Sequence, residues 1–394
     1  MEPLQGIRII DVTSNASGPM AAGMLADQGA DVIRFETVGV GDPSRYVGGT
    51  RGGVSAYNAY MNRNKRSMAV DLKNAQLRPW LYKLIETADV FVQNSRPGAL
   101  DRSGYGFKDL HRLNPQLIYV SISGFGPTGP GASQRVYDPV IQCVAGFAAA
   151  QGTRGAPALM KTIASDKVAA LTAAQAISSA LFARERKTIG GHHLELSMLD
   201  ASLAFLWPEV FWNHGFVGTE GVQSKPAIAE FYRLLRTADG YITVIIVGDG
   251  EFNGACRAMG LETLLADPRF KTLSDRFVNY EPLLAEFERV ALGVASDTLV
   301  ARLLAEDVPC AKANTLDAVL DDPRVTERAS LIEYEHPQGG RMRQARAPAI
   351  FAGEACTVRR PSPGLGEHTI ELLESVGVTA DALATLRQAG AIGC

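Results

Sequence analysis

The chain has 394 residues, of which 46% are hydrophobic and 21% charged, a composition typical of soluble globular proteins. A chain of this length predicts two domains and a substantial hydrophobic core. Its formal net charge of −3 argues against general nucleic-acid binding, although it is compatible with a local basic patch for a small anion.

The cysteine pattern and the first residues indicate in which cellular compartment the protein is expected. The five cysteines are widely spaced and lack a CxxC pattern, which argues against a disulfide framework or a zinc site. The first residues do not have the pattern of a secretory signal peptide, and no apolar run is long enough to span a bilayer. We therefore expect a cytoplasmic protein without a membrane partner.

The N-terminal half alternates strand and helix patterns. A strand at 6–12, a helix at 18–30 and a strand at 31–36 form a βαβ unit, which predicts a parallel sheet with a right-handed crossover. The turn at 13–19 contains no GxGxxG, so we expect a Rossmann-like fold without the dinucleotide-binding fingerprint. The alternation continues with strands expected at 67–71, 90–92, 117–121 and 193–197, helices at 75–87, 107–113, 138–150 and 167–187, and a helix through Trp207 and Trp212.

Two segments interrupt this alternation. Residues 37–66 are rich in Gly, Arg and Asn, and a connection this long is uncommon in a compact domain unless it serves a site or wraps a partner. Residues 123–132 are rich in Gly and Pro and cannot form regular structure. For the second segment we favour a surface loop over a mobile lid.

The pattern changes again around 215–230, where we expect a second unit to begin. This unit is predicted to contain a strand at 240–247, helices at 250–260, 280–292 and 296–306, and a strand followed by a helix at 311–319. We divide the chain into a large domain of residues 1–224 and 326–394 and a smaller α+β domain of residues 225–325. Residues 365–394 predict an amphipathic helix and a final short helix that dock on the large domain.

Asp166 stands where an extended segment gives way to the long helical pattern ending near Gly190. An aspartate at this position is typical of an N-cap, whose side chain accepts a hydrogen bond from a free amide of the first turn. The positive end of the helix dipole also keeps a carboxylate ionised and able to attack an electrophile. From the local sequence, both interpretations of Asp166 remain open.

Cationic side chains recur at the ends of the predicted strands. Lys73 follows one strand, Arg96 and Arg102 follow another, and Arg135 follows the glycine-rich loop. Ligands of open α/β sheets bind at the carboxyl ends of the strands, so these groups predict a site for a phosphorylated ligand. The sequence contains no HExxH, GxSxG or P-loop motif, and we expect no metal. An acidic side chain is therefore the best catalytic candidate.

Short stretches in a fixed order along nearly the whole chain carry a family resemblance. They are residues 3–11, 18–19, 25–33, 41–42, 64–67, 71–73, 88–90, 94–98, 114–115, 123–130, 137–142, 166, 190–191 and 365–368. In these stretches the sequence resembles the class III CoA-transferases, the group that contains formyl-CoA transferase and the carnitine-linked CoA-transferases. The resemblance implies an α/β large domain built from both ends of the chain, a small domain, and an interlocked homodimer.

The resemblance also implies an activity. Asp166 matches the family nucleophile, which takes part in moving CoA from an acyl-CoA donor to a carboxylic acid acceptor through an aspartyl-CoA thioester. No tightly bound cofactor is implied, because coenzyme A and acyl-CoA are substrates. The residues that match CoA-contacting positions of the family are Ala16, Ser17, Val70, Asp71, Leu72, Lys73, Asn94, Ser95, Arg96, Arg102, Arg135, Val136, Tyr137 and Asp138.

The sequence departs from the family pattern in two places. Thr37 stands where some members have a basic residue that contacts the adenine nucleotide. Residues 248–250 are a poor substitute for the glycine-rich loop that covers the nucleophile in formyl-CoA transferase. The second departure makes formate and oxalate less suitable substrates and leaves the acid pair open.

Two alternatives to CoA transfer are compatible with the same scaffold. An acyl-CoA racemase or epimerase needs two groups that exchange a proton at the carbon next to the thioester. Related racemases pair a histidine just before the aspartate that matches Asp138 with an aspartate near the helix start. This chain has Tyr137 in place of the histidine, and tyrosine is a poor base at neutral pH. The second alternative is a CoA-binding protein without catalysis, and the presence of Asp166 argues against it.

Overall fold

The structure, a computed structural model, describes residues 1–153, 155–218 and 220–393. The chain forms two compact units, Met1–Pro208 with Ala329–Cys394, and Glu209–Arg328. The large and small domains predicted from the sequence, with boundaries at 225 and 325, stay a prediction. No helix in the described part of the chain is both long and apolar enough to cross a membrane.

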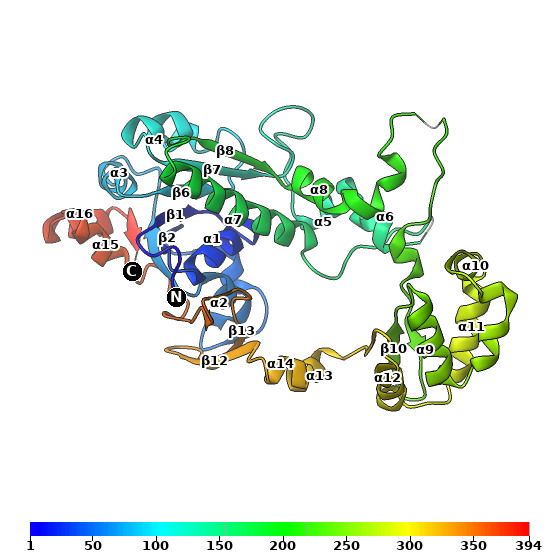
Figure 1. The fold of residues 1–394 in the computed structure, drawn as a ribbon. Coiled ribbons are helices and arrows are strands. Elements are labelled where there is room, and N and C mark those ends of the chain that lie inside the picture. Colours follow the sequence, from blue (N-terminus) through cyan, green and yellow to red (C-terminus); the bar gives the residue numbers. More distant parts are fainter. Residues whose placement is uncertain (154, 219, 394) are drawn as a thin grey trace. The chain divides into compact units, whose positions relative to one another are not determined.

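A seven-stranded sheet forms the centre of the first unit, in the order β16-β5-β2-β1-β6-β7-β8 (Figure 1). Its strands are β1 (Arg8–Val12), β2 (Asp31–Glu36), β5 (Lys65–Val70), β6 (Val90–Gln93), β7 (Ile118–Ser123), β8 (His193–Ser197) and β16 (Ile392–Gly393). All neighbouring strands are parallel except β16, which pairs antiparallel with β5. The predicted parallel sheet is therefore confirmed, and its order places a switch point between β1 and β6.

Helices cover both faces of this sheet, because its central strands are apolar on both sides. On one face α1 (Ser17–Asp27) packs along α7 (Ala164–Glu185), which also contacts β7, β8 and α5 (Asp138–Ala145). On the other face, α3 (Arg78–Glu86) lies between α4 (Phe107–Leu113) and α15 (Thr369–Ser375). Buried Leu84, Phe91 and Leu372 belong to the core between these helices and the sheet.

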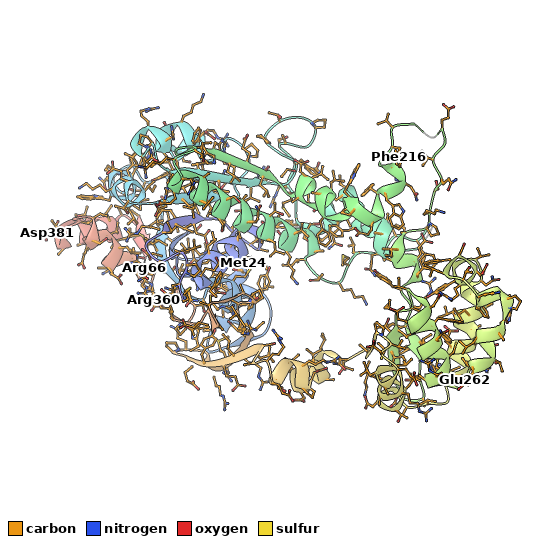
Figure 2. All side chains as sticks on the ribbon, in the orientation of Figure 1. Met24, Arg66, Phe216, Glu262, Arg360 and Asp381 are labelled. Carbon is orange, nitrogen blue, oxygen red and sulfur yellow. The ribbon has the colours of Figure 1, made fainter. Side chains whose placement is uncertain are left out.

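The C-terminal segment docks on the first unit as predicted, but it ends differently. After α15 and α16 (Ala380–Gln388) the chain does not end in a helix but adds β16 to the edge of the sheet. Arg66 of β5, labelled in Figure 2, forms ion pairs with Asp31 of β2 (2.6 Å) and with Glu371 of α15 (3.0 Å), and the second pair holds this segment in place. The C-terminal segment is thus joined to β5, a strand from the N-terminal half of the chain.

Two helix predictions in the first unit are wrong. The helix expected at 138–150 consists of α5 and α6 (Phe147–Gln151), separated by Gly146 with a φ of 101°, a value that favours glycine. The helix expected through Trp212 is α8 (Met198–Val210), which ends sooner. Pro208 lies inside its last turn and has no N–H for the Ala204 carbonyl, which weakens the end of the helix.

The connection at 37–66 is more ordered than its sequence predicts. It contains a 3-10 turn η1 (Pro43–Tyr46), the short strands β3 (Thr50–Arg51) and β4 (Val54–Ser55), and the helix α2 (Ala56–Asn62). The Ser55 hydroxyl caps α2 by accepting the Asn58 N–H. Two hairpins near the C-terminus were also not predicted: β12 (Leu331–His336) with β13 (Gly340–Ala345), and β14 (Ile350–Phe351) with β15 (Glu354–Ala355).

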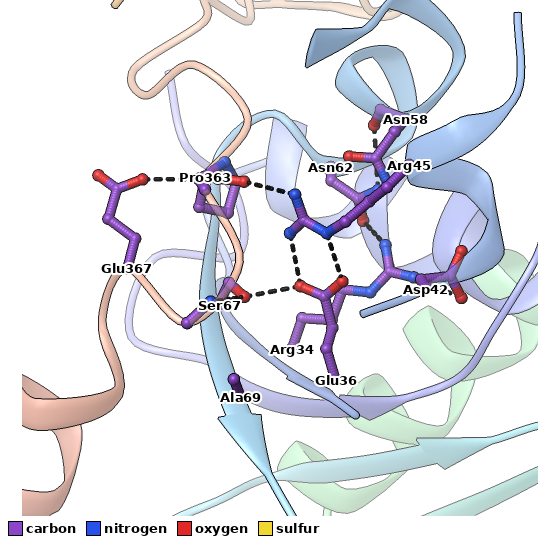
Figure 3. Close-up of polar contacts among 12 residues, drawn as sticks. Arg34, Glu36, Asp42, Arg45, Asn58, Asn62, Ser67, Ala69, Pro363 and Glu367 are labelled. Carbon is purple, nitrogen blue, oxygen red and sulfur yellow. Dashed lines mark hydrogen bonds and ion pairs between the residues drawn. The ribbon is translucent and has the colours of Figure 1, made fainter. Parts of the chain in front are cut away.

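A buried ionic network fixes this connection to β2 (Figure 3). Arg34 pairs with Asp42 at 3.0 Å, and both side chains are almost fully buried. The Glu36 carboxylate accepts hydrogen bonds from Arg45 at 2.6 and 2.8 Å and from the Ser67 hydroxyl at 2.6 Å. Leaving one of these buried charges unpaired would cost free energy, so the network holds the segment after β2 in one conformation.

The second unit is a small α+β structure. Its antiparallel sheet has the order β11 (Cys310–Lys312), β10 (Tyr241–Val244), β9 (Leu235–Arg236). Its helices are α9 (Asp249–Met259), α10 (Leu273–Val278), α11 (Tyr280–Ala291), α12 (Ser296–Ala305), α13 (Leu316–Asp321) and α14 (Pro323–Thr326). Ile242, Phe252 and Phe287 are buried in a separate core, so this unit has its own hydrophobic centre.

Candidate active site around Asp166

The candidate site residues follow the carboxyl ends of the parallel strands. Ala16 and Ser17 come after β1, Asp71 to Lys73 after β5, and Asn94 to Arg96 after β6. Arg135 to Asp138 lead from the glycine-rich loop after β7 into α5. The strands are parallel, so these segments share one edge of the sheet, as the sequence predicted.

Asp166 is the third residue of α7 rather than its N-cap. The cap position is Ile163, which makes no side-chain capping bond. The N-cap interpretation of Asp166 is therefore wrong, because the helix begins at Ala164, three residues earlier than its apolar pattern indicates. The Asp166 N–H, one of the amides that a helix start leaves free, instead donates to Oδ1 of Asp138 on α5 at 3.1 Å.

Asp138 and Gln142 form a clamp at the start of α7. Asp138 is 3% exposed, and its Oδ2 accepts a hydrogen bond from Gln142 Nε2 at 2.6 Å, one helical turn along α5. Gln142 also donates to the Thr162 carbonyl at 3.0 Å and accepts the Met160 N–H at 2.9 Å. One amide side chain therefore ties α5 to the segment that leads into Asp166. We did not predict Gln142; its spacing of four residues from Asp138 was the available signal.

The Asp166 carboxyl has an unusual environment. Burial and the nearby charge of Asp138 raise its pKa to about 6, while hydrogen bonds from the Ser17 hydroxyl and N–H act in the opposite direction. Above this pH the side chain is an anion, and it is more basic than an ordinary aspartate. Asp166 therefore combines charge with greater basicity than usual, which suits a carboxylate nucleophile.

Tyr57 of α2 belongs to the same environment, although the sequence did not indicate it. Burial and then the charges of Asp166, Asp42 and Asp138 raise the pKa of its phenol, which stays protonated at neutral pH. Its hydroxyl is thus available as a hydrogen-bond donor. We expect the Tyr57 hydroxyl to make the surroundings of Asp166 more polar.

Three of the predicted contact residues have structural roles. The Asn94 side chain accepts the Ser14 N–H at 2.9 Å and donates to the Ser14 carbonyl at 2.8 Å, which joins the loop after β1 to the end of β6. The Val70 side chain lies in the apolar core. Asp71 accepts the Lys73 N–H at 3.0 Å and thereby shapes the turn after β5. These side chains organise the edge of the sheet.

The cationic residues divide into two groups. Arg63, Lys65 and Arg66 pair with Asp27, Asp11 and Asp31 at 2.7, 2.8 and 2.6 Å, so their charges serve the fold. The other group is exposed and has no ion-pair partner among the described residues. It consists of Lys73, Arg96, Arg102 and Arg135. Free cations at the carboxyl edge are the groups that a phosphorylated ligand needs.

A small polar cavity of about 140 Å³ adjoins this edge, with Ser95, Ser121 and His193 among its lining residues. Gln93 accepts the Ser95 N–H at 2.7 Å and donates to the Ser121 hydroxyl at 2.8 Å. The Ser121 hydroxyl lies 2.8 Å from Nε2 of His193, whose ring stacks on Phe107. His193 is therefore a hydrogen-bonded structural histidine.

The remaining predicted positions differ in exposure. Leu72 and Val136 are partly buried, whereas Tyr137 is 59% exposed just before α5. Thr37 is exposed after β2 and brings no charge. Residues 248–250 open α9, so in this structure they begin a helix instead of forming a glycine-rich loop.

Comparison with known proteins identifies the family. The sequence profile of CoA-transferase family III matches residues 4–369, nearly the entire chain. The chain belongs to CoA-transferase family III. It is therefore an enzyme of the class whose substrates are CoA thioesters and acids, in agreement with the resemblance seen in the sequence.

Individual relatives show the same relationship. The chain is 33% identical over 404 residues to an acyl-CoA transferase of Fusarium pseudograminearum, covering 99% of this chain and 88% of the relative. It is 31% identical over 383 residues to a succinate–glutarate CoA-transferase of Agrobacterium fabrum, covering 94% and 95% of the two chains. A CaiB/BaiF family protein from Brucella suis has a similar structure, with a TM-score of 0.81, 31% identity, and coverage of 95% and 99%.

Proposed function

We propose that this protein moves CoA from an acyl-CoA donor to a carboxylic acid acceptor through an aspartyl-CoA thioester on Asp166. One observation carries this proposal: Asp166 is held at the start of α7 by Asp138, and burial and the Asp138 charge raise the pKa of its carboxyl to about 6. Such a group is ionised at neutral pH and basic enough to attack a thioester.

The reaction proceeds by four exchanges at carbonyl carbons. The Asp166 carboxylate attacks the donor thioester, the carbon–sulfur bond breaks, and a mixed anhydride and CoA thiolate result. The thiolate attacks the aspartyl carbonyl and releases the donor acid, leaving the aspartyl-CoA thioester. The acceptor carboxylate attacks this thioester and again releases CoA thiolate. The thiolate then attacks the acceptor acyl carbonyl, which gives the new acyl-CoA and restores Asp166.

Neighbouring groups have separate roles in this scheme. The Ser17 hydroxyl and N–H, which hydrogen-bond the Asp166 carboxylate, also stabilise the oxyanions that develop at its carbonyl. Asp138 and Gln142 position the nucleophile. Lys73, Arg96, Arg102 and Arg135 bind the CoA phosphates. The energy of the thioester is retained in each intermediate, so the reaction requires no ATP.

The quaternary structure is part of the proposal. Apolar side chains of α5, α7 and α8 are exposed on the first unit, and they are Val144, Leu171, Phe182, Phe205 and Trp207. Soluble monomers rarely expose this much apolar surface in neighbouring elements, so we assign these residues to the interface of an interlocked homodimer.

We also assign the protein to the cytoplasm, because Cys143, Cys256, Cys310 and Cys356 are free thiols.

The geometry disfavours racemisation on the same scaffold. Both Asp138 oxygens already accept hydrogen bonds, one from the Asp166 N–H and one from Gln142. Asp138 is therefore occupied in positioning, and the chain has Tyr137 where related racemases have a histidine. Exchange of the substrate α-hydrogen with deuterated water distinguishes the two reactions, since CoA transfer leaves that hydrogen in place.

Replacement of the nucleophile tests the proposal. Asp166→Ala is expected to abolish CoA transfer across a panel of acyl-CoA donors and acids, read by mass spectrometry. The variant should retain the oligomeric state and CoA affinity of the wild type, because the cationic edge is unchanged. Turnover by Asp166→Ala at the wild-type rate rules out the assigned nucleophile.

A further inference from the structure

The loop between β1 and α1, residues 13–16, is held by side chains from two other parts of the first unit. Asn94, which follows β6, accepts the Ser14 N–H at 2.9 Å and donates to the Ser14 carbonyl at 2.8 Å. Asp42, in the connection after β2, accepts the Asn15 N–H through its Oδ2 at 3.0 Å. Both side chains bind the loop backbone, so they determine the path that the chain takes from β1 to α1.

Asn15 depends on such a partner because its backbone is in the left-handed region, with a φ of 65°. Asparagine tolerates this region better than most residues, but it is less favourable there than in an extended or right-handed conformation. Asp42 is a fixed partner for the Asn15 N–H. It is 4% exposed, its Oδ1 accepts the Ser44 N–H at 2.7 Å, and its Oδ2 lies 3.0 Å from Nη2 of Arg34 (Figure 3).

The loop leads into Ser17, the first residue of α1, whose hydroxyl and N–H hydrogen-bond the Asp166 carboxyl. This N–H is one of the amides that a helix start leaves free, so its direction follows the direction in which the helix begins. Because α1 packs along α7 and Ser17 is 3% exposed, Ser17 has little room to adjust. A displacement of Asn15 is therefore passed along the backbone to the groups that bind Asp166.

We propose that Asp42 is a positioning residue for CoA transfer, which acts through Asn15 and Ser17 on Asp166. The connection after β2 thus serves the candidate active site in addition to its packing against β2. The inference rests on the proposed function in one respect, namely that Asp166 is the attacking group. It gives the nucleophile a second anchor besides the clamp of α5.

The groups around the Asp166 carboxyl come from several elements. Asp138 of α5 contributes a charge that raises the pKa of Asp166, and Tyr57 of α2 is close enough for the Asp166 charge to raise the pKa of its phenol. Lys167, the next residue of α7, donates to the Thr162 hydroxyl at 2.7 Å. Within the described part of the chain, the hydrogen bonds that lower the pKa of Asp166 come from α1.

The direction of a pKa change distinguishes positioning by Asp42 from a direct effect of its charge. The Ser17 hydrogen bonds stabilise the ionised form of Asp166, so their loss raises the pKa of Asp166. Removal of the negative charge of Asp42 by itself acts in the opposite direction, since a nearby anion disfavours ionisation of a carboxyl group. A rise of this pKa in a variant of Asp42 therefore reports the displacement of Ser17.

Carbon-13 NMR of the full-length protein with labelled aspartate carboxyl groups tests this proposal. The Asp166 signal should titrate near pH 6 in the wild type and be missing from Asp166→Asn. In Asp42→Ala its midpoint should rise by at least about half a pH unit, in the same direction as in Ser17→Ala. In steady-state kinetics, kcat of Asp42→Ala should fall about tenfold, with KM for acyl-CoA close to its wild-type value.

A second variant and a control keep the test independent of the buried charges. Asn94→Ala releases the other contact with the same loop without removing a charge, and it should also raise the pKa of Asp166. Asp27→Ala is the matched control, because it breaks the buried ion pair of Asp27 with Arg63 (2.7 Å) at the opposite end of α1. It should unfold at lower urea concentration than the wild type, with the pKa of Asp166 and kcat unchanged.

An unchanged or lower pKa of Asp166 in folded Asp42→Ala overturns the proposal, and if that variant does not fold, an unchanged pKa in Asn94→Ala does so. An equal rise in Asp27→Ala also overturns it, because the effect then belongs to general loosening of the fold. The NMR titration does not depend on turnover. Failure of the proposed function appears separately, as turnover by Asp166→Ala at the wild-type rate.

Discussion

Oδ1 of Asp138 accepts the backbone N–H of Asp166 at 3.1 Å, so two acidic residues from different helices are held next to each other. The contact satisfies an amide that the helix start leaves free, and it also places a second negative charge beside the candidate nucleophile. Asp138 therefore both positions Asp166 and helps to raise the pKa of its carboxyl. This relationship leads to the first two predictions.

Replacing Asp138 with asparagine should move the pH dependence of the reaction. The Asp138→Asn variant keeps a side-chain oxygen that accepts the Asp166 N–H but removes the charge that raises the pKa of Asp166. Wild-type kcat/KM should fall as the pH drops through about 6, where Asp166 takes up a proton. In Asp138→Asn this fall should occur at lower pH, and an unchanged profile contradicts the role of Asp138.

Removing the Asp166 charge should stabilise the fold at neutral pH. The pKa of Asp166 is raised from 3.8 to about 6 in the folded state, so the folded protein binds the proton more tightly and ionisation costs stability as the pH rises. The shift corresponds to an upper limit of about 3 kcal/mol. Asp166→Asn should therefore unfold at higher urea concentration than the wild type at pH 8, with the difference lost near pH 4. A constant difference across this range would exclude the electrostatic cause.

Breaking the clamp should slow the reaction without weakening the binding of the CoA ester. Gln142→Leu removes the links from α5 to Thr162 and Met160, which lead into Asp166. Displacement of a nucleophile by a fraction of an ångström lowers kcat by roughly tenfold to a hundredfold, while KM for acyl-CoA stays close to its wild-type value. Steady-state kinetics measure both.

The control for this clamp is Gln388→Leu, on the exposed side of α16, which should leave both constants unchanged. An increase of KM in Gln142→Leu at constant kcat assigns Gln142 to ligand binding instead.

Neutralising the exposed cations should weaken the binding of acyl-CoA and leave the chemical step intact. Arg96→Gln and Arg102→Gln each remove a charge without an ion-pair partner in the described part of the chain, so KM should rise several-fold with little change in kcat. The difference from the wild type should shrink as the salt concentration increases. Arg112→Gln, on the exposed side of α4, serves as the matched control, and an equal effect there argues against a phosphate site.

The parallel sheet could be predicted because its strands are continuous apolar runs between helical patterns. The strand β16 could not, since Ile392–Gly393 is only two residues long and is recognisable as a strand only beside β5. Helix α2 was missed for a related reason: it has only seven residues, and a Ser55 cap and the ionic network around Arg34 order it.

Prediction of the candidate site from the sequence has the same limit. Asp166 was correctly placed at a helix start, but its capping role was wrong because the helix begins at Ala164, and the contact of its N–H with Asp138 spans 28 residues of the chain. The sequence also cannot distinguish Lys65, paired with Asp11 in the core, from Arg102, which is exposed. Both depend on which residues the fold brings together, and no local pattern contains that information.

Trapping of the activated carboxyl group identifies the nucleophile directly. The wild type is incubated with an acyl-CoA donor and hydroxylamine, which attacks an aspartyl anhydride or thioester and leaves a hydroxamate. Peptide mass spectrometry then locates the modification. We expect a hydroxamate on Asp166, with loss of activity that requires the acyl-CoA. Modification at another carboxylate, or none with any donor that the enzyme turns over, contradicts it.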